Sequence, residues 1–176
     1  MSVDYIDFHF PGLSNVHCVF TTRHGGQSSG PYATGNLSLE TGDDRAIVMQ
    51  NRRELQSKLG FHVWQELHQV HEQAVYMDLE EDCLEGPRLD GDGMCTNRPG
   101  HALITKTADC QAILLADTAG KHVASLHCGS RGNAGNFPAA GVRKFCAYYG
   151  IDPTQVLAVR GPSLGPGQSE FVNFDA

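Results

Sequence analysis

The chain has 176 residues, enough for one domain with a hydrophobic core, and 40% of them are hydrophobic. Its formal net charge of −7 argues against a general affinity for nucleic acid or for an anionic membrane surface. No apolar run is long enough to predict a membrane span, and the N-terminus lacks the basic-then-apolar pattern of a signal peptide. We therefore expect a cytoplasmic protein whose six cysteines are mostly free thiols or metal ligands.

The first part of the chain predicts a strand at residues 16–23 and a helix that Asp43 or Asp44 caps at its N-terminus. Gly60 is the expected stop of that helix, which would run to about Leu59. Apolar residues recur at helical spacings along it and predict one buried face. We expect its arginines and glutamate to lie on a solvated face, so the helix is interpreted as scaffold.

Residues 67–77 are interpreted as a strand, because Val75 and Tyr76 favour extended structure. In a strand, His68 and His71 would point to opposite faces, so only one of them could face a site. Residues 84–100 are rich in glycine, proline and aspartate and are expected to be a loop. Within them, the segment from Asp90 to Gly93 resembles a calcium loop only superficially, and a turn is the better interpretation.

Three apolar runs then follow closely, at residues 101–107, 111–116 and 122–127. The turn at residues 117–120 joins the second run to the third, which predicts a β-hairpin. Pairing in a hairpin would bring the start of one strand level with the end of the next. We therefore expect Cys110 to lie near His127.

The last part of the chain predicts a glycine-rich loop at residues 129–136, a helix and a final strand. Asn136 is the expected N-cap of the helix, with Pro138 in its first turn and Gly150 at its end. The strand covers residues 155–160. Strands outnumber helices, and hairpins mix with crossover helices, so the predicted class is α+β.

Two imidazoles and a thiol make His71, Cys110 and His127 a candidate metal site. A catalytic zinc ion takes three protein ligands and keeps a fourth position for water or substrate. The alternative from the residues alone is a buried core cysteine with surface histidines, and the spacing does not decide between the two.

Two charged residues flank these candidate ligands. Arg131 lies in the glycine-rich loop before the helix, where a guanidinium and backbone N–H groups suit phosphate or another oxyanion, or it is an ordinary surface arginine. Asp109 either orients a ligand, acts as a base or caps a turn. Other known constellations are absent: the sequence has no His-x-His pair, no Cys-x-x-Cys pair and no His-Glu-x-x-His motif.

Taken together, the motifs make the chain similar to the laccase-domain family, also called the multicopper polyphenol oxidoreductase family. The matches include Thr107-Ala-Asp-Cys110 and Gln69-Val-His71, which contain two of the candidate ligands. Further matches occur in family order along nearly the whole chain, at residues 21–26, 30–33, 36–37, 42–44, 51–52, 90–91, 99–103, 114–117, 127, 129, 131–132, 161–162 and 165.

The resemblance implies one domain over residues 1–176, a mixed β-sheet with flanking helices of the cytotoxic-necrotizing-factor-like type, without the family's usual C-terminal portion. It implies that His71, Cys110 and His127 bind zinc, with copper as the alternative metal. It implies a purine nucleoside phosphorylase that acts on adenosine or inosine and phosphate, with adenosine deaminase as a side activity. The expected partners are therefore a nucleoside and phosphate, with no nucleic acid and no membrane, and the expected protein is a monomer or homodimer.

The expected catalytic residues are the three metal ligands together with Asp109. The expected substrate- or phosphate-binding residues are Arg131, Gly129, Gly132, Asn36 and Gln69. A competing role for Cys110 is that of a nucleophile, although a thiolate committed to zinc is a poor free nucleophile.

The chain departs from the family at Ser130, where relatives carry tryptophan, and losing that aromatic surface is expected to alter base stacking or pocket shape. Three other functions stay open. They are an amidase acting on a peptidoglycan precursor, a copper-dependent phenol oxidase, and a catalytically inactive domain that binds a metal or a partner. The missing His-x-His pair weighs against the phenol oxidase.

Overall fold

The computed structural model describes residues 2–168 and confirms the α+β class. A five-stranded sheet has the order β4-β5-β8-β7-β9, and two smaller sheets pair β1 with β2 and β3 with β6. The strands are β1 (Tyr5–Phe8), β2 (Cys18–Thr21), β3 (Val63–Glu66), β4 (Val75–Met77), β5 (Gly93–Thr96), β6 (His101–Ile104), β7 (Gln111–Asp117), β8 (Val123–Cys128) and β9 (Val156–Arg160). The α-helices are α1 (Arg45–Leu59), α2 (Ser130–Ala134) and α3 (Phe137–Tyr149), and short 3-10 turns occupy Gly30–Tyr32, Pro153–Gln155 and Pro166–Gln168.

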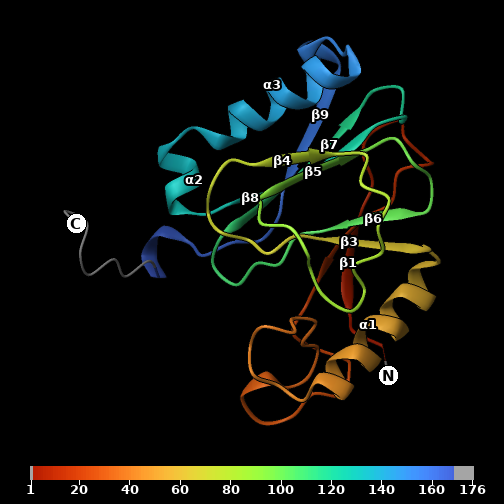
Figure 1. The fold of residues 1–176 in the computed structure, drawn as a ribbon, viewed down its shortest axis with the longest axis vertical. Helices are drawn as coiled ribbons and strands as arrows, with labels where there is room; N and C mark the ends of the chain where they lie inside the picture. The colour runs from red at the N-terminus through yellow and green to blue at the C-terminus, as the bar shows by residue number, and fades with distance from the viewer. Residues whose placement is uncertain (1, 169–176) are drawn as a thin grey trace.

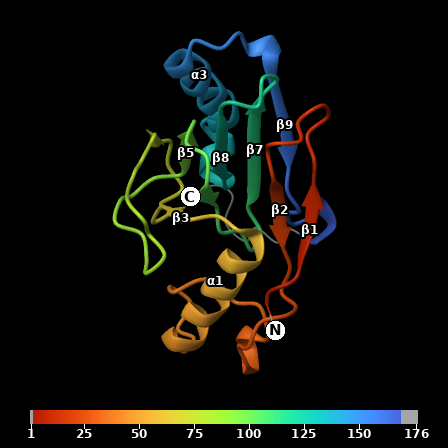
Figure 2. The same ribbon diagram turned by 90° about the vertical axis from the view of Figure 1, so that its right-hand side faces the viewer.

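The two faces of the five-stranded sheet are covered by different elements (Figures 1 and 2). Side chains of strand β7 alternate between the two faces, so they contact both covering layers. Ile113 and Leu115 pack with Phe137 and Phe145 of α3, whereas Leu114 and Ala116 pack against the segment that contains β1 and β2. Both faces of the central strands are therefore buried, which explains their nearly continuous apolar sequence.

Helix α1 begins and ends where the sequence predicts. The Asp44 side chain accepts hydrogen bonds from the N–H groups of Ala46 and Ile47, and Gly60 ends the helix in the left-handed conformation at φ 73°. The helix packs through Leu55 against β3 and β6, where the single tryptophan of the chain, Trp64, is fully buried.

The predicted hairpin is also confirmed. β7 and β8 pair antiparallel, with Ala112 opposite His127 and Gln111 opposite Cys128. All six cysteines lie within the described residues, and each is a free thiol.

Several predicted elements are wrong. Only Val75–Met77 of the expected strand at 67–77 is a strand, and the preceding residues form an irregular segment with one isolated bridge between His68 and Asp90. The expected loop at 84–100 contains β5, and the expected loop at 129–136 contains α2. Strands β1 and β3 were not predicted. Each missed strand has four residues, too short for a periodic pattern.

Two further expectations about helices need correction. Asn136 occupies the N-cap of α3, but its side chain makes no capping hydrogen bond. The arginines of α1 do not all face solvent, because Arg52 is fully buried. Its guanidinium pairs with the equally buried Glu66, at 2.8 Å from Nη1 to Oε2, and donates to the carbonyl oxygens of Leu37 and Leu84. Pairing and hydrogen bonding make this burial tolerable.

Within residues 2–168, every helix is too short or too polar to cross a membrane.

Arg52→Met is expected to lower the free energy of unfolding by about 3 kcal/mol, because it leaves the buried Glu66 carboxylate without its main partner. This loss is small for the removal of one partner from a buried ion pair, because Lys106 still contacts the Glu66 carboxylate. Chemical denaturation followed by circular dichroism measures it. The matched control is Arg53→Met, which changes the exposed neighbouring arginine and should cost less than about 0.5 kcal/mol. Equal losses in the two variants would contradict a stabilising role for the buried pair.

Candidate metal centre

Three side chains that are far apart in the sequence converge at one end of the five-stranded sheet. The possible ligand atoms of His71, Cys110 and His127 all lie within 4.8 Å of one another. Cys110 Sγ is 3.8 Å from His71 Nε2, and the rings of His71 and His127 meet edge to face with centroids 4.7 Å apart. The structure thus brings together the three residues that the sequence singles out as ligands.

Each of the three is placed by a different local feature. His127 lies in the buried strand β8, and pairing of β7 with β8 brings Cys110, immediately before β7, to its side. His71 lies in the irregular segment after β3 and has a left-handed backbone with φ 62°. Residues other than glycine rarely adopt this conformation, so neighbouring contacts must hold it.

Asp92 supplies those contacts, a role that the sequence analysis does not predict. Its carboxylate accepts hydrogen bonds from the backbone N–H groups of His71 (3.0 Å) and Glu72 (2.8 Å). It also contacts His127 Nδ1 at 2.7 Å, and its side chain is 0% exposed. In the sequence analysis, residues 90–93 are interpreted as a turn, so Asp92 is assigned no role in the site. The position of Asp92 directly before a buried strand is the sequence feature that could have indicated a buried carboxylate.

The contact with Asp92 determines which nitrogen of His127 can bind a metal. A proton on Nδ1 donated to the carboxylate leaves the Nε2 lone pair free, as in many metal-bound histidines. Burial lowers the pKa of His127, while the hydrogen bond and the charge of Asp92 act in the opposite direction. The net lowering favours the neutral imidazole that a metal needs.

The surroundings of Cys110 disfavour a thiolate in the absence of a cation. Burial raises the pKa of the Cys110 thiol, and the negative charges of Asp109 and Asp92 raise it further. An activated cysteine nucleophile needs the opposite environment, with nearby positive charge. A bound metal ion would supply that charge and stabilise the thiolate.

The residues fit a metal ion, and Gly129 provides the clearest sign. A Cβ atom at this position would lie 2.5 Å from His71 Cδ2 and 3.1 Å from Cys110 Sγ. The backbone φ of −80° is open to any residue, so glycine is needed here for space and not for conformation. Two imidazoles and one thiol are a donor set that zinc accepts.

The other predicted residues divide into two groups. Gly132 is buried and Arg131 is exposed in α2, which begins directly after Gly129, and Asp109 is exposed beside Cys110. These four residues therefore lie next to the candidate ligands in the chain. The first N–H groups of a helix have no partner within the helix, so the start of α2 offers donors close to the centre.

Asn36 and Gln69 are engaged in contacts within the protein. The Asn36 amide nitrogen donates to Thr41 Oγ1 and Asp43 Oδ2, at 2.9 and 3.0 Å, which organises the loop before α1. Both amide atoms of Gln69 bond the backbone of Lys106. The expected substrate contacts of these two residues stay predictions.

The fold and the site define an α+β protein with a His-Cys-His centre that could hold a metal ion. A sequence model of the family described as multi-copper polyphenol oxidoreductase laccase matches residues 17–174. The chain therefore belongs to this family.

Comparisons with individual proteins agree with this assignment. The chain is 34% identical over 153 residues to the purine nucleoside phosphorylase of Haemophilus influenzae, an alignment covering 86% of this chain and 59% of the relative. It is 34% identical over 164 residues to the purine nucleoside phosphorylase YlmD of Geobacillus stearothermophilus, covering 89% and 60%. The crystal structure of that YlmD superposes with a TM-score of 0.84 at 31% identity, over 90% of this chain and 62% of the other. The chain thus spans about three fifths of the length of these relatives.

Gly129→Ala is expected to push His71 away from Cys110 and to weaken zinc binding by about 10-fold or more, with little change in global stability. Competition with a chromophoric chelator measures the zinc affinity. Gly167→Ala is the matched control, because a Cβ atom there would meet nothing within 4 Å. Unchanged zinc affinity in Gly129→Ala would show that the metal does not occupy this position.

Proposed function

We propose that the chain is a zinc-dependent purine nucleoside phosphorylase that acts on adenosine or inosine, with adenosine deaminase as a side activity. The observation that carries the proposal is the convergence of His71, Cys110 and His127 around the space left by Gly129. The names of the relatives, purine nucleoside phosphorylases at 34% identity, support the substrate class. A cytoplasmic location and a monomeric or homodimeric state stay part of this prediction.

In the proposed reaction, a phosphate oxygen forms a bond to the anomeric carbon of the ribose. The bond from that carbon to the purine nitrogen breaks, and the base leaves with the bonding electrons and takes up a proton. A zinc ion held by His71, Cys110 and His127 would supply a Lewis acid for a substrate group. In deamination, an oxygen atom from water would instead form a bond to the carbon that carries the amino group of adenosine, and the amino group would leave as ammonia to give inosine.

The residues of the chain have distinct roles in this proposal. His71, Cys110 and His127 hold the metal. Arg131, with the backbone N–H groups between Gly129 and Gly132, would hold the charge of phosphate as it attacks. Asp109, exposed beside Cys110, is the candidate group for proton transfer.

Copper and phenol oxidation remain the alternative suggested by the family description. The described residues 2–168 contain one cluster of three or more potential metal-binding side chains, the His-Cys-His centre. One such centre, in a sequence without a His-x-His pair, argues for a single metal ion and against a multicopper cluster. An amidase or an inactive binding domain is favoured by no specific contact in the site.

The proposal predicts phosphate-dependent release of free base from adenosine and inosine by the zinc-loaded protein. Cys110→Ala is expected to reduce the release to background, because it removes one of three protein ligands. Cys146→Ala, which alters a buried cysteine on α3, is the control and should retain activity. Chromatography measures the base, and a coupled assay measures ammonia. Zinc-loaded wild type that releases neither product would overturn the proposal for these substrates.

Arg131→Gln is expected to lower kcat/KM for phosphate by about 10²-fold, because it removes a charged donor from the attacking anion. Zinc content should stay unchanged, since Arg131 is not a ligand. Arg143→Gln, on the exposed face of α3, is the matched control. A loss of zinc together with activity would assign Arg131 to the integrity of the site and not to phosphate.

A further inference from the structure

Two of the three candidate ligands lie on loops that leave the same pair of parallel strands. β3 and β6 pair in register from Val63 and His101 to Glu66 and Ile104, where the ladder ends. The chain beyond β3 reaches His71 after five residues, and the chain beyond β6 reaches Cys110 after six. Backbone pairing no longer holds these loops together, so other contacts must set the distance between the two ligands.

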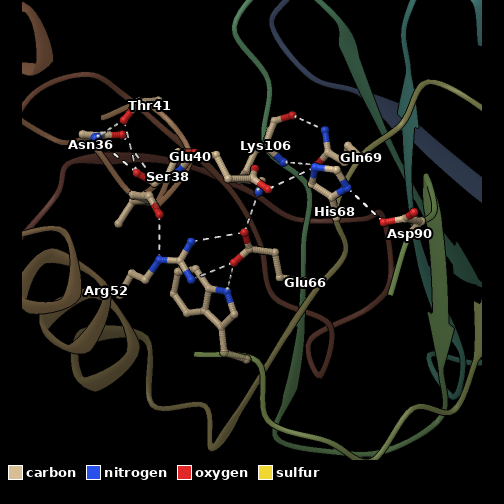
Figure 3. Close-up of polar contacts among 12 residues, drawn as sticks. Asn36, Ser38, Glu40, Thr41, Arg52, Glu66, His68, Gln69, Asp90 and Lys106 are labelled. Carbon is tan, nitrogen blue, oxygen red and sulfur yellow. Dashed lines mark hydrogen bonds and ion pairs between the residues drawn. The ribbon is translucent and has the colours of Figure 1, made fainter. Parts of the chain in front are cut away.

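Beyond the end of the β3–β6 ladder, the side chain of Gln69 replaces the next pair of backbone hydrogen bonds. Its Nε2 donates to the carbonyl oxygen of Lys106 at 2.7 Å, and its Oε1 accepts from the backbone N–H of Lys106 at 2.8 Å. A carboxamide has the donor and acceptor of a peptide group, so it can replace one. This pair of bonds ties the His71 loop to the Cys110 loop (Figure 3).

Lys106 is in turn fixed by its own side chain. Its Nζ lies 2.6 Å from Glu66 Oε1 and 2.5 Å from Glu40 Oε2, and the side chain is 17% exposed. Glu66 is fully buried, where Arg52 and the indole N–H of Trp64 also bond it. The formal charges of these two cations and two carboxylates cancel. Lys106 therefore connects the Gln69 hydrogen bonds to the buried ion pair of Arg52 and Glu66 (Figure 3).

The opposite side of the His71 loop is held separately. Asp92 bonds the backbone N–H of His71 and the ring of His127, and His68 bridges to Asp90 at 2.9 Å. The contacts of Asp92 relate His71 to His127, and through the β7–β8 pairing they relate it indirectly to Cys110. The contacts of Gln69 with Lys106 add a direct link between the His71 loop and the Cys110 loop.

We infer that Gln69 and Lys106 form a clamp that positions His71 against Cys110 and thereby sets the affinity and geometry of the metal site. The inference rests on the proposed metal site and gives Gln69 a role different from the expected substrate contact. Both are positioning residues, since they act through His71 and Cys110 and hold no metal themselves.

The test compares Gln69→Met with Gln56→Met. Both changes remove a glutamine side chain that donates to a backbone carbonyl, but Gln56 bonds His62 at 3.2 Å on the surface of α1. Zinc affinity is measured by chelator competition, and ligand geometry by the absorption spectrum of the protein loaded with Co(II). Gln69→Met is expected to weaken zinc binding by about 10-fold and to alter the Co(II) spectrum, whereas Gln56→Met leaves both unchanged.

A second pair of variants tests the ammonium group. Lys106→Met keeps the backbone hydrogen bonds to Gln69 and loses both ion pairs, so it should weaken zinc binding less than Gln69→Met, and Lys106→Arg should restore it. Circular dichroism of the metal-free proteins checks folding. Wild-type affinity and spectrum in Gln69→Met would overturn the clamp while leaving the proposed function intact. Failure of the wild-type protein to bind zinc would instead overturn the proposed metal site. The measurement on the wild type therefore distinguishes failure of the metal site from failure of the clamp.

Discussion

The candidate centre depends on one buried carboxylate. Asp92 accepts hydrogen bonds from the backbone of His71 and Glu72 and contacts the ring of His127, so a single side chain fixes both histidines. A carboxylate without exposure to water is costly unless its oxygens are satisfied, and these three contacts satisfy them. The same contacts hold His71 in its unfavourable left-handed conformation. Without Asp92, neither the backbone of one histidine nor the tautomer of the other would be determined.

The five-stranded sheet makes this arrangement rigid. Asp92 immediately precedes β5, Cys110 immediately precedes β7, and His127 lies near the end of β8, which pairs with both strands. The backbone N–H of His127 also donates to the carbonyl oxygen of Asp92 at 2.7 Å. Antiparallel pairing therefore gathers these residues at one end of the central strands, and hydrophobic packing on both faces holds the strands in place. His71 is the exception, since it comes from an irregular segment and depends on side-chain contacts.

The sequence predicted the parts that local chemistry controls. Asp44 and Gly60 mark the ends of α1, and the turn after β7 marks the hairpin that joins Cys110 to His127. It did not predict Arg52, because an arginine on an amphipathic helix normally faces solvent, and its buried partner lies 14 residues away. It also missed Asp92, because its contacts are made across 20 to 35 residues of sequence and its position before a buried strand does not identify the partners. The expected ligand set rested on resemblance as well as on residue type, since the spacing alone left it undecided.

X-ray absorption at the zinc edge of the wild-type protein tests the central claim most directly. Two histidines and one cysteine should give about two nitrogen neighbours at 2.0–2.1 Å and one sulfur neighbour at about 2.3 Å. The sulfur shell identifies Cys110 as a ligand, because Cys110 is the one cysteine within the convergent group of described residues. A zinc environment of nitrogen and oxygen alone, without sulfur, would contradict the His-Cys-His centre and the function proposed from it.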